Sequence, residues 1–173
     1  EKETIEGTVF IENAGMVLLS PYIPGLFDRM QLTENKAFKN DECQQKAIYM
    51  LQYSATGMTD PEEHVLVLNK IICGMDVHAP MGPVIALTSE EKALVDSLIQ
   101  AVIANWKAVG NTSVEGFRVS FLTRPGSIVE EEKRFVLTVE EKSYDMLLDH
   151  IPWSIARLKM SWMEKLIDIT WRA

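Results

Sequence analysis

Helix-breaking residues divide the apolar segments of this chain at short intervals. Pro21 and Pro24 interrupt the first apolar run, Gly57 and Pro61 separate the next two, and residues 80–83 hold two prolines and a glycine. Proline removes a backbone donor and clashes inside a helix, and glycine weakens one. The pattern therefore excludes one long helix or a heptad coiled coil, and it requires short elements that pack together.

Helix signals dominate up to about residue 122. Pro24 suits the first turn of a short helix, where its missing N–H costs nothing, and Asn13 is a candidate cap for an earlier turn. Further helices are expected over residues 41–53, from Asp60-Pro61 to Gly74, from Thr88 to Trp106, and from Thr112 to Leu122. Thr88 and Thr112 each begin a capping box, in which a glutamate follows the hydroxyl after three residues.

The segment from Thr88 to Trp106 has the widest apolar surface of the expected helices. Its apolar side chains cover more than half of the helix circumference, which favours burial against several neighbours. We therefore expect this helix to be the central element of the core. The residues concerned are Leu94, Val95, Leu98, Ile99, Val102, Ile103 and Trp106.

The hydrophobic period changes to two after the turn at Arg124–Gly126. Residues 128–130 and 135–139 predict a hairpin, and alternation recurs over 156–160 and 167–171. Thr8–Ile11 suits a short strand, and Tyr144–His150 a short helix. The sequence predicts an α+β fold, in which an N-terminal helical part of about five helices packs with a small C-terminal antiparallel sheet of about three to four strands.

Length and charge limit the number of domains and the kinds of partner. At roughly 150 residues per domain, the 173 residues form one globular domain, 1–173, with residues 1–7 expected to be frayed. The chain begins with Glu1 rather than Met, so we expect a fragment of a longer polypeptide. The formal net charge of −8 disfavours nucleic acid and anionic membranes as partners. No apolar run reaches the ~18 residues of a membrane helix.

Patterns that specify catalysis or cofactor binding are absent from the sequence. The three histidines and two cysteines lack the spacing of zinc ligands, and neither GxSxG nor a phosphate-binding loop is present. Cys43 and Cys73 are expected to be free buried thiols, although proximity in a disulfide stays open. Glu62-Glu63 and Glu90-Glu91 suit first helical turns, where carboxylates complement the helix dipole. We expect no enzyme activity, no metal or other cofactor, and no small-molecule substrate.

Tryptophans gather near the C-terminus. Their simplest role is in the core, because aromatic side chains contribute large buried areas. Trp and Met are also enriched at the centres of protein interfaces. We select Trp153, Trp162 and Met163 as candidate partner-binding residues, since they lie at the ends of expected strands, where loops can present them.

Four ordered sets of segments resemble one known family. They are Glu12–Leu19; Leu51–Tyr53 with Thr56-Gly57, Pro61-Glu62 and Leu68–Gly74; Trp106 with Asn111–Ser113, Gly116–Arg118, Phe121, Leu122, Arg124 and Gly126; and Leu147–Asp149 with Pro152-Trp153, Trp162-Met163 and Ile169–Trp171. Their order and spacing resemble the C-terminal part of the contractile injection system tape measure proteins, which belong to phage-tail-like particles of bacteria. The resemblance covers about residues 8–171. Ser161 departs from it where the family favours proline, which affects only the local backbone.

The resemblance implies a structural role without catalysis or cofactors. A tape measure protein occupies the lumen of the inner tube during assembly and sets its length. Even a fully helical chain of this size would span only about 260 Å, and the prolines and glycines forbid that helix. We therefore expect a globular end domain that anchors the ruler to the baseplate hub or spike, or to the first inner tube rings. Its expected location is the bacterial cytoplasm during assembly and then the particle, in the tube lumen or baseplate.

Two alternatives belong to other functional classes. One is a cell-wall-active hydrolase domain carried on the particle, which needs a cleft with a carboxylate or histidine of shifted pKa. The other is an adaptor for cargo or tube proteins, which an exposed apolar patch of a few hundred Å² would favour.

Overall fold

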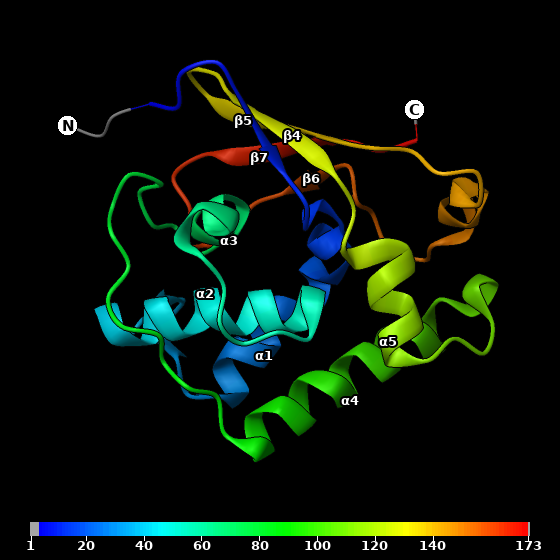
Figure 1. Cartoon of the computed structure of the whole chain (residues 1–173), viewed down its shortest axis with the longest axis horizontal. Helices are drawn as coiled ribbons and strands as arrows, with labels where there is room; N and C mark the ends of the chain where they lie inside the picture. Colours follow the sequence, from blue (N-terminus) through cyan, green and yellow to red (C-terminus); the bar gives the residue numbers. More distant parts are fainter. Residues whose placement is uncertain (1–3, 173) are drawn as a thin grey trace.

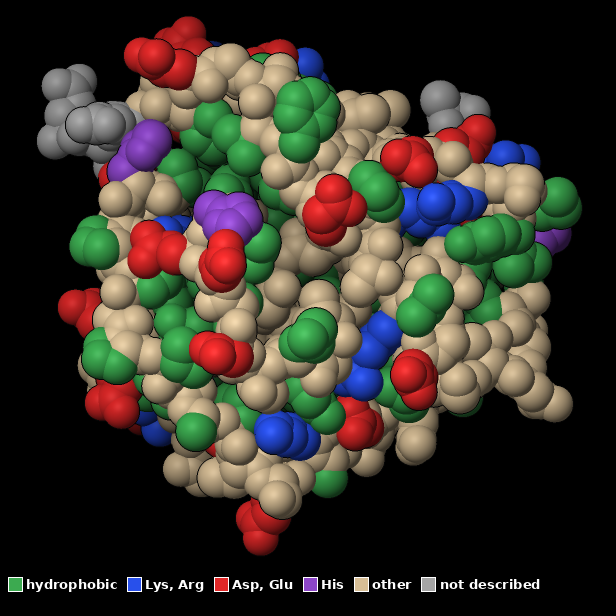
Figure 2. Space-filling model, viewed as in Figure 1, with side chains coloured by type: hydrophobic (Ala, Val, Ile, Leu, Met, Phe, Trp, Pro, Cys, Tyr) green, Lys and Arg blue, Asp and Glu red, His purple; other side chains and the backbone are tan. Residues whose placement is uncertain are grey.

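A computed structural model describes residues 4–172 and shows a sheet layered against helices (Figure 1). The sheet lies on one side, and the helices lie below it and extend around one end. One hydrophobic cluster joins the layers and reaches from Ile5 to Trp171. The expected α+β class is therefore confirmed. On the face drawn in Figure 2, acidic side chains are scattered rather than gathered in one patch.

The main sheet has five strands in the order β1-β4-β5-β7-β6. These strands are β1 (Thr8–Ile11), β4 (Gly126–Glu130), β5 (Arg134–Val139), β7 (Leu166–Thr170) and β6 (Arg157–Leu158). The predicted hairpin is confirmed as β4 and β5, which pair antiparallel. A separate small sheet pairs β2 (Thr33–Glu34) with β3 (Ala37–Phe38).

Two details of the expected sheet are corrected. It is mixed rather than antiparallel, because β5 and β7 are parallel, with Leu137 beside Ile169. Parallel neighbours need a long crossover, and residues 140–165 supply it with the 3₁₀ helix η5 (Asp145–His150) and β6. The sheet is also wider than expected, because β1 from the start of the chain pairs with β4. Local alternation predicts strands but not which of them become neighbours.

The helical layer consists of short elements, as the breakers require. Gly57 ends α2 in the left-handed conformation (φ 74°), and Thr88 begins α4 with the expected capping box. Pro24 lies in the first turn of α1. The elements are η1 (Ala14–Tyr22), α1 (Ile23–Arg29), α2 (Asp41–Thr56), η2 (Glu63–Leu66), α3 (Val67–Ile72), α4 (Ser89–Asn105), η3 (Lys107–Val109), α5 (Val114–Phe117) and the π-helix η4 (Arg118–Leu122).

The central helix is α2 rather than α4. Every residue of α2 from Ala47 to Ala55 is buried, and α2 contacts η1, α3, α4 and η4. Helix α4 buries Val95, Ile99, Val102 and Ile103, whereas Leu94 and Leu98 stay partly exposed. The expectation for α4 was wrong because its wide apolar surface is only partly covered. The polar side chains within the buried part of α2, such as Gln52 and Ser54, made its sequence less apolar overall than that of α4.

Two predicted helix starts also differ. Residues 60–62 are not helical, and the carboxylate of Glu63 instead accepts hydrogen bonds from the Lys70 Nζ and the Met81 N–H. At α5 the cap is Ser113, whose Oγ accepts from the Gly116 N–H, while Thr112 donates to the Val109 carbonyl. The first difference accompanies a contact of Glu63 with the distant Met81, and the second is a local choice between two neighbouring hydroxyl side chains.

Cys43 and Cys73 are both free, Cys73 fully buried and Cys43 only partly. Burial raises the pKa of the Cys73 thiol well above its ordinary value. Ile5 is buried and its N–H donates to Glu130 Oε1, although frayed ends were expected there; residues 1–3 lie outside the described part. Within residues 4–172, no helix has the length and apolarity needed to cross a bilayer.

Candidate functional site

Trp153 is half-buried just after η5 and packs on the N-terminal part of the helical layer. Its Nε1 donates to the Leu18 carbonyl at 3.0 Å, and its ring meets Tyr22 edge-on, with centroids 5.5 Å apart. A buried indole N–H needs such an acceptor. Trp153 thus fixes the C-terminal crossover against η1 and keeps part of its ring at the surface.

Trp162 and Met163 attach a later part of the same crossover to the helical layer. Trp162 donates from Nε1 to the Ile72 carbonyl at 2.8 Å and packs on Phe38 and Phe27, at 5.0 and 5.8 Å between centroids. Met163 is only 5% exposed. The structure does not bring the three sequence candidates into one surface: two half-exposed rings pack on different neighbours, and Met163 lies in the core.

A groove of about 420 Å³ lies between α1 and α4. Tyr22 contacts the Trp153 ring and also lines the groove. Asn105 Nδ2 donates to the Tyr22 hydroxyl at 2.7 Å and fixes that ring. The groove is lined by Pro21, Tyr22, Gly25, Leu26, Arg29, Leu94, Ser97, Leu98 and Ala101. It is the surface that sequence reasoning missed, because Leu94 and Leu98 have the spacing of core residues.

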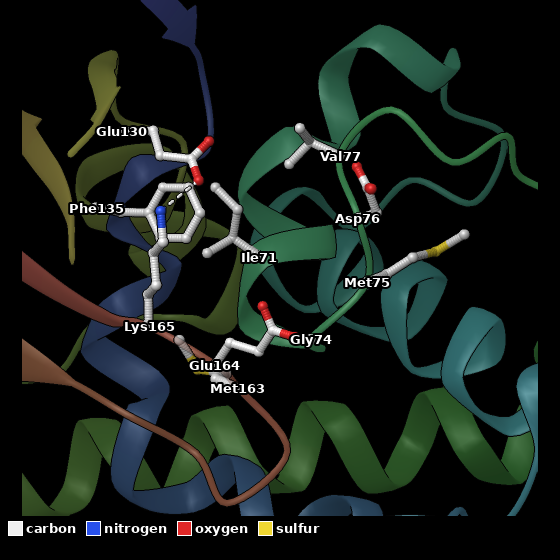
Figure 3. A pocket seen from close by; sticks show the side chains of 10 residues that line it. All are labelled: Ile71, Gly74, Met75, Asp76, Val77, Glu130, Phe135, Met163, Glu164 and Lys165. Atoms are coloured by element: carbon white, nitrogen blue, oxygen red, sulfur yellow. Dashed lines mark hydrogen bonds and ion pairs between the residues drawn. The ribbon is translucent and has the colours of Figure 1, made fainter. Parts of the chain in front are cut away.

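A smaller cavity of about 60 Å³ lies between the segment after α3 and the sheet (Figure 3). Lys165 Nζ contacts Glu130 Oε2 at 2.7 Å and lies 5.5 Å from the Phe135 ring centroid. Glu130 also accepts from the Ile5 N–H. This volume holds a few waters at most, and the Lys165–Glu130 pair ties β7 to β4 and to the start of the chain.

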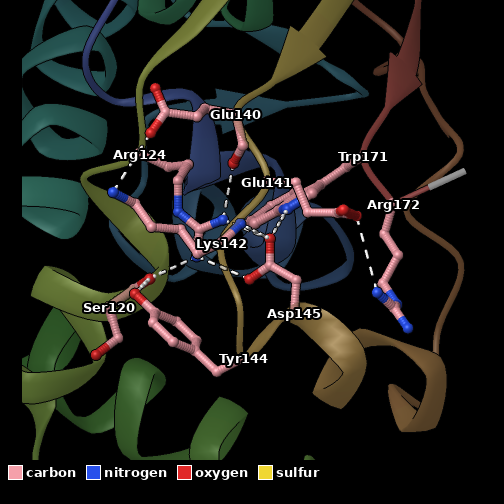
Figure 4. A network of polar contacts seen from close by, with 9 residues as sticks. All are labelled: Ser120, Arg124, Glu140, Glu141, Lys142, Tyr144, Asp145, Trp171 and Arg172. Atoms are coloured by element: carbon pink, nitrogen blue, oxygen red, sulfur yellow. Dashed lines mark hydrogen bonds and ion pairs between the residues drawn. The ribbon is translucent and has the colours of Figure 1, made fainter.

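Beyond the other end of the sheet, Arg124 and Asp145 form a buried polar network (Figure 4). Their side chains are 1% and 0% exposed, and two hydrogen bonds of 2.6 and 3.0 Å join them. The Trp171 Nε1 and the Lys142 N–H also donate to Asp145. Burial raises the pKa of the Asp145 carboxyl, but these hydrogen bonds outweigh burial and hold its pKa below the ordinary value. Every charge here is paired, as a structural brace requires.

A neutral polar cluster lies inside the helical layer. Asn13 Nδ2 donates to Gln52 Oε1 at 2.8 Å and to Asn69 Oδ1 at 2.9 Å, and Asn69 donates in turn to the Ile48 carbonyl. Asn13 makes no side-chain cap bond at η1, so its expected capping role was wrong. These amides link the start of η1 to α2 and α3. Their mutual hydrogen bonds allow the three polar side chains to be buried.

The described residues contain no group of three or more His, Cys, Asp or Glu side chains placed to hold a metal ion. Among them, the α1–α4 groove combines an apolar lining with a neighbouring aromatic side chain, Trp153, which contacts the lining residue Tyr22.

Comparison with known proteins gives one match. A family model described as the contractile injection system tape measure protein matches residues 1–171. No curated protein and no solved structure matches the chain.

Proposed function

Because this chain belongs to the contractile injection system tape measure protein family, we propose that it is a non-enzymatic assembly domain that anchors the length-setting ruler. Tape measure proteins are structural proteins of the particle and associate with its other proteins. The proposed partners are the baseplate hub or spike, or the first rings of the inner tube. Assembly is proposed to begin in the bacterial cytoplasm, and the domain then lies inside the particle.

The observation that carries this proposal is the closure of both ends of the chain into one sheet. Strand β1 starts at Thr8 and β7 ends at Thr170, and only β4 and β5 separate them. The longest helix, α4, has 17 residues, which corresponds to about 26 Å. Such a body cannot span a tube by itself. In our proposal the ruler therefore lies in another part of a longer polypeptide, and this compact domain forms its fixed end.

The α1–α4 groove is the proposed contact surface. It is apolar, its exposed rim on α4 carries the small residues Ser97 and Ala101, and Trp153 adds an aromatic edge. Aromatic anchors beside a concave apolar surface are typical of interface centres. Trp162 is a second proposed contact, with a half-exposed ring outside the groove lining, and the buried Met163 follows it in the core.

Electron microscopy of particles tests the anchor directly. Cells would produce the parent protein without residues 4–172, in parallel with the complete protein. We expect tubes to be lost, or to form at uncontrolled lengths without baseplates. Particles of normal length and yield would contradict the proposal and return attention to an enzymatic or adaptor role.

A matched pair of surface variants separates loss of contact from loss of folding. Ala101→Arg places a long cation in the groove, and Ala108→Arg makes the same change at an exposed position outside the groove lining. We expect fewer complete particles with Ala101→Arg only, with both variants folded by circular dichroism. Equal particle yields would remove the groove from the proposal.

A further inference from the structure

Strand β1 leaves one edge of the main sheet open. It pairs with β4 on one side only, and within residues 4–172 no main-chain hydrogen bond reaches its other side. Its sequence, Thr-Val-Phe-Ile, is uncharged and consists of residues that favour strands. The Phe10 side chain is 80% exposed. An uncharged open edge of this kind is a template for pairing with another strand.

The opposite edge is protected in the usual ways. Strand β6 has only two residues, and one of them is the exposed Arg157. Arg157 forms an ion pair with Asp168 on the neighbouring strand, which keeps a charge on that edge. Short, charged edges resist pairing, so the two edges of this sheet differ in their capacity to accept a strand.

A groove of about 720 Å³ lies beside β1, between the start of the chain and the segment that follows α3. Val9 of β1, Val67 of α3 and Val77 of the following segment line it, together with Thr4, Ile5, Glu6 and His78. Figure 1 shows α3 and the segment after it below and beside β1. Val9, Val67 and Val77 are all partly exposed, so one apolar side chain from an added strand would find apolar partners there.

The charges around this edge select the kind of segment that fits. Glu6 lines the groove before β1 and Glu12 follows β1, and both are exposed. The lining contains neither Lys nor Arg. In Figure 2, hydrophobic side chains near the grey N-terminal atoms are bordered by acidic side chains and two histidines. An incoming segment with basic residues on both sides of an apolar centre therefore matches both ends of β1.

A second copy of this chain fits less well. Antiparallel pairing of two β1 strands centred on Val9 would place Glu6 of one copy opposite Glu12 of the other. Like charges directly opposite each other destabilise a strand pair, and each chain carries a net charge of −8.

We propose that β1 and its groove bind an extended segment of a different polypeptide by strand addition. The main chain of that segment continues the sheet beyond β1, an apolar side chain enters between Val9, Val67 and Val77, and flanking Lys or Arg side chains meet Glu6 and Glu12. In strand addition, main-chain hydrogen bonds supply the affinity, and pockets for alternate side chains supply the specificity for the sequence of the added segment. This surface is separate from the α1–α4 groove, so it does not depend on the anchoring role.

The test uses the 173-residue chain and a synthetic peptide of about ten residues, with alternating Val and Thr between Lys-Arg ends. Nuclear magnetic resonance would follow the backbone amides as the peptide is added. We expect saturable shifts at Thr8–Ile11, Val67 and Val77, and at least ~10-fold slower hydrogen exchange at the β1 amides that point outward.

Matched variants and peptides identify the contacts. Val67→Lys removes an apolar wall and adds a repelling charge, and we expect it to weaken binding about tenfold or more. Val119→Lys makes the same change at a valine that is 70% exposed outside the groove, and it should bind like the unchanged chain. A peptide with N-methylated alternate amides, and one with Glu in place of Lys and Arg, should both bind far less.

Three results would overturn the inference. The first is no shift up to about millimolar peptide, since that is the range of even weak specific binding. The second is equal binding of the N-methylated peptide, which would remove the main-chain pairing. The third is self-association of the unchanged chain in sedimentation experiments that Val67→Lys abolishes, which would assign the edge to a second copy.

Discussion

Arg124 and Asp145 meet inside the molecule, whereas Arg134 and Arg157 meet Asp168 on the face of the sheet that the helices leave uncovered. Both clusters tie the C-terminal part of the chain to earlier elements. Asp145 is 0% exposed and accepts from Arg124, Lys142 and Trp171, while the Arg157 side chain is 74% exposed. The loss of an ion pair should therefore cost more stability in the buried cluster than in the exposed one. Breaking a buried pair leaves an uncompensated charge, whereas breaking an exposed pair leaves a charge that water solvates.

The buried cluster lies at a junction that brings both ends of the chain together. Ala14 N–H donates to the Arg124 carbonyl at 2.9 Å, which joins the start of η1 to the segment before β4. Trp171 brings the end of β7 to the same place. Four changes, from the largest expected effect to the smallest, test the contrast between this junction and the exposed cluster.

The largest loss of stability is expected from a substitution at Gly15, within the junction. A Cβ atom there would lie 1.7 Å from the Phe121 carbonyl oxygen, and backbone atoms cannot move aside easily. Gly15→Ala should cost more than about 4 kcal/mol of the free energy of unfolding, as measured by urea denaturation. Gly25→Ala is the matched control, since nothing lies within 4 Å of its added Cβ. It should be neutral or stabilising by up to ~1 kcal/mol. Equal stability of the two variants would contradict the close approach at Gly15.

Asp145→Ala should give the next largest loss. It leaves the Arg124 guanidinium buried and unpaired, at an expected cost of about 3–5 kcal/mol in the free energy of unfolding. The double variant Arg124→Met with Asp145→Ala should recover part of that loss, because no charge then stays buried. A double variant as unstable as the sum of both single variants would show that the two side chains are not coupled.

Acid should act on the buried cluster below about pH 4. The pKa of Asp145 is lower in the folded chain than in the unfolded one, so its stabilisation is fully present above the unfolded pKa. That stabilisation is lost as the pH falls through the folded pKa. Thermal unfolding should therefore change little between about pH 7 and pH 5 on account of Asp145, and fall towards about pH 2. Asp145→Asn should flatten this part of the profile, and an unchanged profile would contradict the role of Asp145.

Asp168→Asn should give the smallest effect. The hydrogen bond from Arg134 holds the pKa of the Asp168 carboxyl below its ordinary value, but the partner side chains are well solvated. We expect the midpoint of thermal unfolding to shift by less than about 2 °C. The shift should shrink further in about 1 M NaCl, because salt screens exposed pairs. A loss as large as that of Asp145→Ala would remove the distinction between the two clusters.

The parts of the fold that follow from the sequence are those that neighbouring residues decide. The capping box at Thr88, the stop at Gly57, the first turn at Pro24 and the β4–β5 hairpin all depend on residues within one or two turns of each other. Family membership was likewise predicted from the order and spacing of short segments, and the match over residues 1–171 confirms it.

The parts that were missed depend on distant contacts. Asn13 resembles a cap, but its amide reaches Gln52 and Asn69, which are 39 and 56 residues away. Strand β1 pairs with a strand more than 100 residues later, which no local pattern indicates. Leu94 and Leu98 have core spacing, yet they line a groove because no element covers them. For Trp153, the sequence indicated importance but not its hydrogen bond to Leu18 or its place beside the groove.

The most direct test of the anchoring role is photo-crosslinking in assembled particles. A photoreactive amino acid would replace Ala101 in the α1–α4 groove, with Glu132 at the tip of the β4–β5 hairpin as the control position. We expect crosslinks from position 101 to a hub, spike or first-ring tube subunit, and few from position 132. Crosslinks from position 101 to tube subunits along the whole particle, or to no particle protein at all, would contradict a domain fixed at the base of the tube.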